Sequence, residues 1–175
     1  MGADGRERAW VRGAQAGRAS DLEALFLRHW RPAFRAAYLV VHDAAAAEDI
    51  TQEAFLSAVR HLDRFDRRRP FGPWLHRIVV NRAIDWTRAR AARPESPGDG
   101  LERAEAPERR AEGLSPQLVE ALRLLSPEHR AVIVLRYLLD YTPREIGELL
   151  ELPRGTVNSR LRRGLDALAE HLGES

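Results

Sequence analysis

The sequence contains no cysteine and no lysine, and no apolar run approaches the ~20 residues that a membrane-spanning helix needs. Without cysteine, the chain has no disulfide framework, no thiol nucleophile and no cysteine-ligated metal site. The N-terminal stretch MGADGRERAWVRG also lacks the apolar core of a secretory signal peptide. We therefore expect a soluble intracellular protein located in the cytoplasm.

The sequence also lacks the convergent groups that an enzyme needs. Its six histidines are scattered, and no pair has metal-ligand spacing with a third ligand nearby. A phosphate-binding glycine loop and a nucleophile elbow are both absent. We predict no catalytic residue, no metal site and no cofactor, and we rank an enzyme as a distant third possibility.

Charge is unevenly distributed along the 175 residues, although the formal net charge is only +2. Residues 20–59 carry six acids and three arginines, whereas residues 60–93 carry ten arginines and three acids. Residues 94–114 are again acidic, with six acids and three arginines. This polarity predicts one surface for nucleic acid and another for a basic protein partner.

Helical periodicity organises the chain into two parts. Residues 1–19 show no period and are expected to be frayed. A first domain of three helices is expected over 20–91. Its helices are expected to start at a capping box (Ser20, Glu23), at Asp43 with an end near Leu62, and at Gly72-Pro73 with an end near Ala91.

Residues 92–114 change character, because Pro, Gly, Glu and Ser dominate them and no period persists. We predict a flexible acidic linker there. A second helical domain is expected over 115–172, with Ser115 and Ser126 as the caps of its first two helices. The predicted fold class is all-α: a three-helix domain and a four-helix domain joined by the linker.

The segment 141–168 is typical of a helix-turn-helix. Thr142 and Glu145 form a capping box around Pro143, and Leu152-Pro153 interrupts the pattern before a second helix that Pro153 begins. The buried stripe of that second helix is expected to comprise Val157, Leu161, Leu165 and Leu168.

The opposite face of this second helix is polar and basic. Short polar side chains and arginines on an exposed helix after a tight turn suit reading of the DNA major groove. The alternative is a solvated charged face on an ordinary helical hairpin. The candidate DNA-binding residues are Arg154, Asn158, Ser159, Arg162 and Arg163.

The helix expected after Asp43 offers a candidate protein-binding face. Asp49, Gln52 and Glu53 share one side of it, at spacings of three and four residues. Carboxylates and an amide suit bidentate contacts with arginines of another protein. A solvated helix face is the alternative.

The third expected helix and the loop before it combine arginines with aromatic rings. This combination is how single-stranded nucleic acid is held, although buried aromatics beside surface arginines produce a similar pattern. Asn81, on the polar side of the helix, offers a donor and an acceptor to a base edge. The candidate residues are Arg69, Phe71, Trp74, Arg77, Asn81, Arg82 and Arg88.

Three motifs, in this order and spacing, resemble the extracytoplasmic-function (ECF) sigma factors of bacterial RNA polymerase, within the sigma-70 family. They are AEDITQEAF (47–55), the stretch 71–88 and PRGTVNSRLRRGL (153–165), and the match extends over 21–172. Two residues depart from the family pattern. Asn158 stands where Lys or Arg is frequent, and Gly147 stands where Ala is usual and is expected to weaken its helix by up to ~1 kcal/mol.

The resemblance implies a promoter-specificity subunit without catalytic activity. It implies that Asp49, Gln52 and Glu53 bind the β′ clamp helices, that 64–73 with Trp74 and Asn81 capture the opened −10 element, and that the second domain docks on the β flap and reads the −35 element. An anti-sigma factor is an expected partner, and it could hold the chain at the membrane. The alternative is a stand-alone helix-turn-helix repressor or activator that acts without polymerase.

Overall fold

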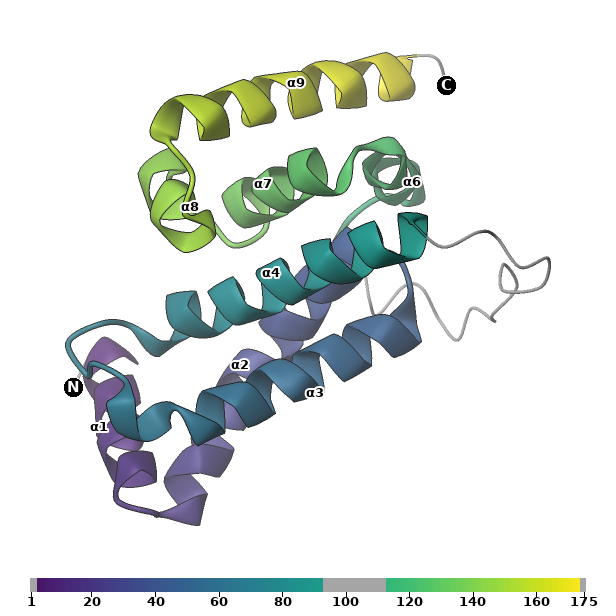
Figure 1. Cartoon of the computed structure of the whole chain (residues 1–175). Helices are drawn as coiled ribbons and strands as arrows, with labels where there is room; N and C mark the ends of the chain where they lie inside the picture. The colour runs from purple at the N-terminus through teal and green to yellow at the C-terminus, as the bar shows by residue number, and fades with distance from the viewer. Residues whose placement is uncertain (1–2, 93–112, 174–175) are drawn as a thin grey trace.

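The computed structural model describes residues 3–92 and 113–173, and every regular element within these two ranges is a helix (Figure 1). The predicted all-α fold class is therefore confirmed. The linker expected at 92–114 lies, apart from its ends, outside the described residues. The first helices are α1 (Ala3–Gln15), α2 (Ala19–Val41), α3 (Ala44–Arg60), the short 3-10 helix η1 (Leu62–Arg64) and α4 (Phe71–Ala91). They are followed by α6 (Pro116–Leu124), α7 (Pro127–Tyr137), α8 (Pro143–Leu150) and α9 (Arg154–Gly173).

Helix α2 is the centre of the first domain and packs against α1, α3 and α4. Leu25, Leu39 and Val40 on α2 are almost fully buried, as are Leu75 and Val79 on α4. The helix continues through Pro32, which lies within it. Burying several whole aliphatic side chains, each contributing about 1.5–3 kcal/mol, is what holds these helices together.

Four of the five expected caps are present. The Asp43 carboxylate accepts the Ala46 N–H at 2.9 Å, and Ser115 and Ser126 cap α6 and α7 in the same way. Thr142 and Glu145 form the predicted capping box of α8. The capping box at Ser20 was wrong, because α2 begins at Ala19 and its N-cap residue, Arg18, makes no side-chain cap bond.

The N-terminal segment differs most from the expectation, because residues expected to be frayed form helix α1. Val11 is 2% exposed, and Trp10 and Ala14 pack against the core of the first domain. These three apolar residues occupy one side of α1 amid polar neighbours. So short an apolar set is too weak a periodic signal to be distinguished from chance.

The helix-turn-helix is formed by α8 and α9, which meet at a tight turn (Figure 1). Glu151 adopts the left-handed conformation there, at φ 55°, and α9 begins at Arg154, one residue later than expected. Val157, Leu161 and Leu168 are buried as predicted, but Leu165 is 41% exposed. Gly164 is buried in its place, because α7 passes so close that a Cβ would lie 3.1 Å from Ile133.

The two domains pack directly against each other. Helix α7 lies against α2 and α4, and α8 lies against α4 (Figure 1). Helix α9 covers the far side of α6, α7 and α8, and its packing partners belong to the second domain. The helix-turn-helix is therefore anchored on the first domain through α7 and α8.

A close backbone contact favours glycine at position 147, although glycine is a poor helix former. A Cβ at this position would lie 2.8 Å from the carbonyl oxygen of Leu152, a backbone atom that cannot move independently of the turn. We expect Gly147→Ala to lower the free energy of unfolding by about 1–3 kcal/mol despite the better helix propensity of alanine. Urea unfolding followed by circular dichroism measures this difference.

The matched control is Gly155→Ala, because a Cβ at Gly155 would meet no atom within 4 Å. This variant should remain within about 1 kcal/mol of the parent. If both variants are equally stable, the close approach of Leu152 does not constrain position 147.

Candidate nucleic-acid interface

The exposed face of α9 collects the five residues predicted to bind duplex DNA. Arg154, Asn158, Arg162 and Arg163 are exposed along the N-terminal half of α9. Ser159 is half-buried, and its hydroxyl donates to the Thr156 carbonyl at 3.0 Å. No acidic side chain interrupts residues 154–163, so this face carries positive potential.

The loop before α4 presents arginines while its aromatic rings turn inward. Arg69 is exposed, but Phe71 is only 3% exposed, with its ring centroid 5.3 Å from that of His29 and 5.7 Å from that of Trp74. The buried ring cannot provide a face for a base, so Phe71 belongs to the core. Trp74 is half-buried and remains the candidate stacking ring.

Along α4, four of the candidate residues share one side. Trp74, Arg77, Asn81 and Arg88 follow one another at spacings of three, four and seven residues, which places them along one helical face. Arg82 lies on a different side and forms an ion pair with Glu53 of α3 at 2.5 Å. The structure thus groups Arg82 with the predicted protein-binding face.

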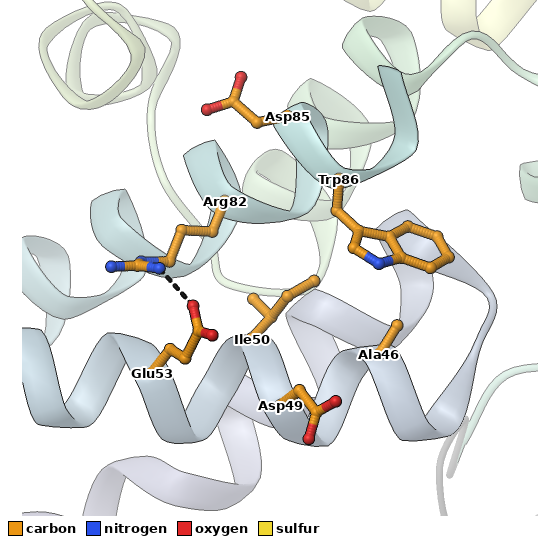
Figure 2. A pocket seen from close by; sticks show the side chains of 7 residues that line it. All are labelled: Ala46, Asp49, Ile50, Glu53, Arg82, Asp85 and Trp86. Carbon is orange, nitrogen blue, oxygen red and sulfur yellow. Dashed lines mark hydrogen bonds and ion pairs between the residues drawn. The ribbon is translucent and has the colours of Figure 1, made fainter. Parts of the chain in front are cut away.

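Asp49, Gln52 and Glu53 are all exposed on α3, as the sequence predicted for a partner-binding face. Asp49 and Glu53 line a groove between α3 and α4 (Figure 2). Figure 2 shows the Arg82 side chain reaching from α4 to Glu53, with Trp86 at the other end of the groove. The guanidinium of Arg90 lies 5.4 Å from the centroid of the Trp86 ring.

The second domain neutralises two arginines of the α4 face. Arg77 forms an ion pair with Glu151 at the turn of the helix-turn-helix, and Arg88 forms one with Glu128 of α7 at 2.7 Å. Sequence reasoning missed both acids, because each is a single glutamate with no local pattern that relates it to α4. Their role depends entirely on how the domains pack.

Arg130 of α7 joins the domains from within. It is 6% exposed and donates to the carbonyls of Leu122, Arg123 and Leu125 near the end of α6. A further N–H of its guanidinium donates to the Val40 carbonyl near the end of α2. The buried guanidinium therefore bonds to carbonyls at the ends of both helices, where regular intrahelical hydrogen bonding stops.

His76 and Tyr141 meet at the same boundary. His76 Nδ1 lies within hydrogen-bond distance of the Tyr141 hydroxyl, at 2.7 Å, while Nε2 is buried without a partner among the described residues. Burial lowers the pKa of His76 to about 4, and His29 of α2 adds to this shift, whereas Glu7 of α1 opposes it. His42 is similar, because burial, Arg130 and Arg123 lower its pKa to about 3.

Nothing in the described parts of the chain suggests a metal or membrane site. Among residues 3–92 and 113–173, no group of three or more His, Asp or Glu side chains could hold a metal ion. Within the same ranges, no helix is long and apolar enough to cross a membrane.

Comparison with known proteins identifies the family to which the chain belongs. A family model for sigma-70 region 2 matches residues 25–93, and one for sigma-70 region 4 matches residues 115–168. The ECF RNA polymerase sigma factor SigW of Bacillus subtilis (strain 168) is 36% identical over 157 residues, or 79% of this chain and 82% of SigW. The ECF sigma factor SigL of Mycobacterium tuberculosis (strain CDC 1551 / Oshkosh) is 34% identical over 171 residues, or 95% of this chain and 97% of SigL.

Two solved structures share the fold. The structure of CnrH in complex with the cytosolic domain of CnrY is 25% identical, with a TM-score of 0.71, and covers 97% of this chain and 99% of CnrH. The sigma factor RpoE of Bartonella quintana, in complex with the anti-sigma factor NepR, is 23% identical with a TM-score of 0.69 and supports the fold alone; it covers 89% of this chain and 98% of RpoE. The chain belongs to the sigma-70 family and, within it, to the ECF sigma factors of RNA polymerase.

The buried histidines predict a pH dependence of stability. Their folded-state pKa values lie below the ~6.5 of an unfolded chain, so acidification protonates the unfolded state first. The contribution of the two histidines to the free energy of unfolding is therefore complete above about pH 7. It is lost as the pH falls through 6 toward 4. Between pH 7 and 5.5 each histidine should remove about 1 kcal/mol of the free energy of unfolding.

His76→Gln should remove about half of this pH-dependent loss, measured by urea unfolding at the two pH values. His61→Gln, which changes an exposed histidine at the end of α3, is the matched control. An unchanged pH dependence in His76→Gln would show that His76 is not held neutral.

Proposed function

We propose that the chain uses three separate surfaces to direct core polymerase to promoters. The α3 face with Asp49, Gln52 and Glu53 binds the β′ clamp helices, the α4 side with Trp74 and Asn81 captures the −10 element, and α9 reads the −35 element. One observation supports this division above the others: the acidic face and the two basic faces lie on different helices, and all three include exposed side chains.

The −35 role is assigned to the exposed half of α9. A helix that follows a tight turn and is anchored by its buried side can enter the major groove as a unit. Arg162 and Arg163 can bond guanine edges or phosphates, and Asn158 suits adenine. The helix that carries the five candidate residues packs mainly within the second domain, and four of the five side chains are exposed, so this face is accessible without rearrangement.

The −10 role is assigned to Trp74, Asn81 and the arginines around them. A base can be read at its pairing edge only after it leaves the stack, at a cost of a few kcal/mol. The half-buried Trp74 ring offers stacking, and the Asn81 amide lies about two turns further along the same side of α4. Arg69 in the preceding loop offers positive charge to the backbone.

An apolar patch beside the acidic face supports a protein partner for α3. Leu56 and Val59, one and two turns beyond Gln52 on the same helix, are 50% and 42% exposed, and Phe26 and Leu27 of α2 are also exposed. Exposed large apolar side chains beside charged groups are typical of an interaction surface.

The promoter itself requires the domains to separate. Positions −35 and −10 lie roughly 25 base pairs apart, which corresponds to roughly 85 Å of duplex at ~3.4 Å per pair. A compact chain of this length has a radius of gyration of only about 16 Å, or a diameter of about 40 Å. We infer that Arg77 and Arg88 exchange Glu151 and Glu128 for phosphates when the second domain leaves α4.

The remaining roles follow from the same family. We propose that the second domain docks on the β flap and that an anti-sigma factor binds the chain, as CnrY binds CnrH and NepR binds RpoE in the solved complexes. Promoters and polymerase place the site of action in the cytoplasm, unless an anti-sigma factor holds the chain at the membrane. The protein itself catalyses no reaction and needs no cofactor.

Charge reversal of the α3 face tests the polymerase role. The double variant Asp49→Arg, Glu53→Arg should lose at least tenfold in affinity for core polymerase, because it presents cations where we expect partner arginines. The fold should survive, since the Glu53–Arg82 pair is exposed and contributes at most about 1 kcal/mol. A pull-down with purified core polymerase, together with circular dichroism, measures both.

The matched control is Glu23→Arg, Glu170→Arg, which makes the same change of net charge at exposed positions outside this face. The control should bind core polymerase as the parent does. Normal recovery of the Asp49/Glu53 variant would favour a repressor or activator that acts without polymerase.

Asn81→Ala tests the −10 role. This variant should reduce promoter opening several-fold while leaving occupancy of the promoter unchanged, because the −35 contacts belong to the other domain. Permanganate footprinting of promoter thymines near −10 reports opening, and DNase footprinting reports occupancy. If Asn81→Ala opens promoters as fully as the parent, the base pocket lies elsewhere.

A further inference from the structure

We propose that helix α1 holds the loop Phe65–Pro70 in place for −10 recognition, with Glu7 and Gln15 as its positioning residues. The inference rests on the proposed role of this loop at the −10 element. It concerns a helix that none of the sequence motifs includes and to which the proposed function assigns no task.

Gln15 fixes the start of the loop. Its side-chain amide nitrogen donates to the Leu62 carbonyl at 2.8 Å and to the Phe65 carbonyl at 3.0 Å. Leu62 begins η1, and Phe65 is the residue at which the chain leaves it. A single side chain therefore ties both ends of the 3-10 turn to α1.

Glu7 fixes the end of the loop. One of its carboxylate oxygens accepts the Phe71 N–H at 3.1 Å, and the other lies 3.1 Å from His29 Nε2 and 3.0 Å from Arg28 Nε. Helix α4 has no side-chain cap at Pro70 and no acid in its first turn. Glu7 supplies this missing acceptor and the negative charge that a helix N-terminus favours.

The Glu7 side chain is held in its ionised form. The hydrogen bond with His29 keeps the pKa of Glu7 below its ordinary value, against the effect of burial, and Phe71 N–H and Arg28 lower it further. The carboxylate is 13% exposed, so water competes little for these contacts. Hydrogen bonds to a charged acceptor in such a site contribute more than neutral ones.

Between these two anchors, the loop exposes its arginines. Arg67, Arg68 and Arg69 are exposed, and Asp66 braces Arg68 through a bond of 3.0 Å. Helix α1 is itself fixed to the core by Val11. Fixing both loop ends on one rigid helix removes conformational freedom before DNA binds, which lowers the entropic cost of ordering the loop on the promoter.

Limited trypsin digestion tests whether α1 restrains the loop, without any polymerase. Trypsin cleaves after arginine, and cleavage in a folded protein tracks the open population of the segment. In Glu7→Ala, Gln15→Ala we expect cleavage after Arg67 and Arg68 to accelerate roughly tenfold, because three hydrogen bonds to the segment are lost. Glu7→Gln, whose amide oxygen still accepts the Phe71 N–H, should change the rate less than threefold.

Two controls distinguish opening of the loop from opening of the rest of the molecule. Arg8→Gln, Arg12→Gln changes the exposed side of α1 and should leave loop cleavage unchanged. Cleavage after Arg162 and Arg163 of α9 reports opening elsewhere in the same molecule. Equal acceleration in the loop and in α9, or no acceleration in the loop, would contradict the proposal that α1 restrains the loop.

Promoter opening by holoenzyme tests the consequence. The Glu7/Gln15 double variant should lose several-fold in permanganate reactivity near −10, while −35 occupancy and binding to core polymerase stay at the parental level. Parental opening in a variant whose loop is rapidly cleaved would overturn the positioning role. Failure of the parent itself to open promoters would instead refute the proposed function, and the trypsin result would still decide whether α1 restrains the loop.

Discussion

Helix α4 belongs to the first domain but packs against both domains. The positions of the other helices depend on this shared packing. Leu75, Val79, Val80 and Ala83 are all completely buried. Helices α2 and α3 cover α4 from the first domain, and α7 and α8 cover it from the second. The helix that carries the proposed −10 residues is therefore also the platform on which the helix-turn-helix domain rests.

The contacts at this boundary differ in how readily they can be exchanged. The Arg77–Glu151 and Arg88–Glu128 pairs are partly exposed and contribute at most about 1 kcal/mol each. Phosphates can replace these glutamates, with counterion release favouring the exchange at low salt. Arg130 and the His76–Tyr141 contact are buried, so separating them exposes polar groups that water must then satisfy. The contacts that hold the domains together can thus be exchanged in part for contacts with DNA and polymerase.

The second domain and the caps of α3, α6, α7 and α8 could be predicted from the sequence. A Ser, Thr or Asp side chain before a helix accepts a backbone N–H only a few residues away, so the pattern is local. The same reasoning failed where the deciding contact was distant in sequence. Phe71 has the composition of a stacking ring, but His29 and Trp74 enclose it. Gly147 resembles a weak helix residue until the approach of Leu152 is known. The α3 acids, the α9 arginines and Asn81 are accessible or half-exposed as the sequence suggested, and their binding roles stay predictions.

The distance between the domains tests the central claim most directly. The chain has no cysteine, so Glu23→Cys and Glu170→Cys introduce two unique labelling sites at exposed positions on α2 and α9. Dipolar electron resonance or fluorescence transfer then measures the separation of the labels. In the free chain it should lie within about 40 Å. In a promoter-bound holoenzyme it should exceed roughly 60 Å, as the spacing of the two elements requires. An unchanged distance on an occupied promoter would contradict the account, because α4 would then remain covered.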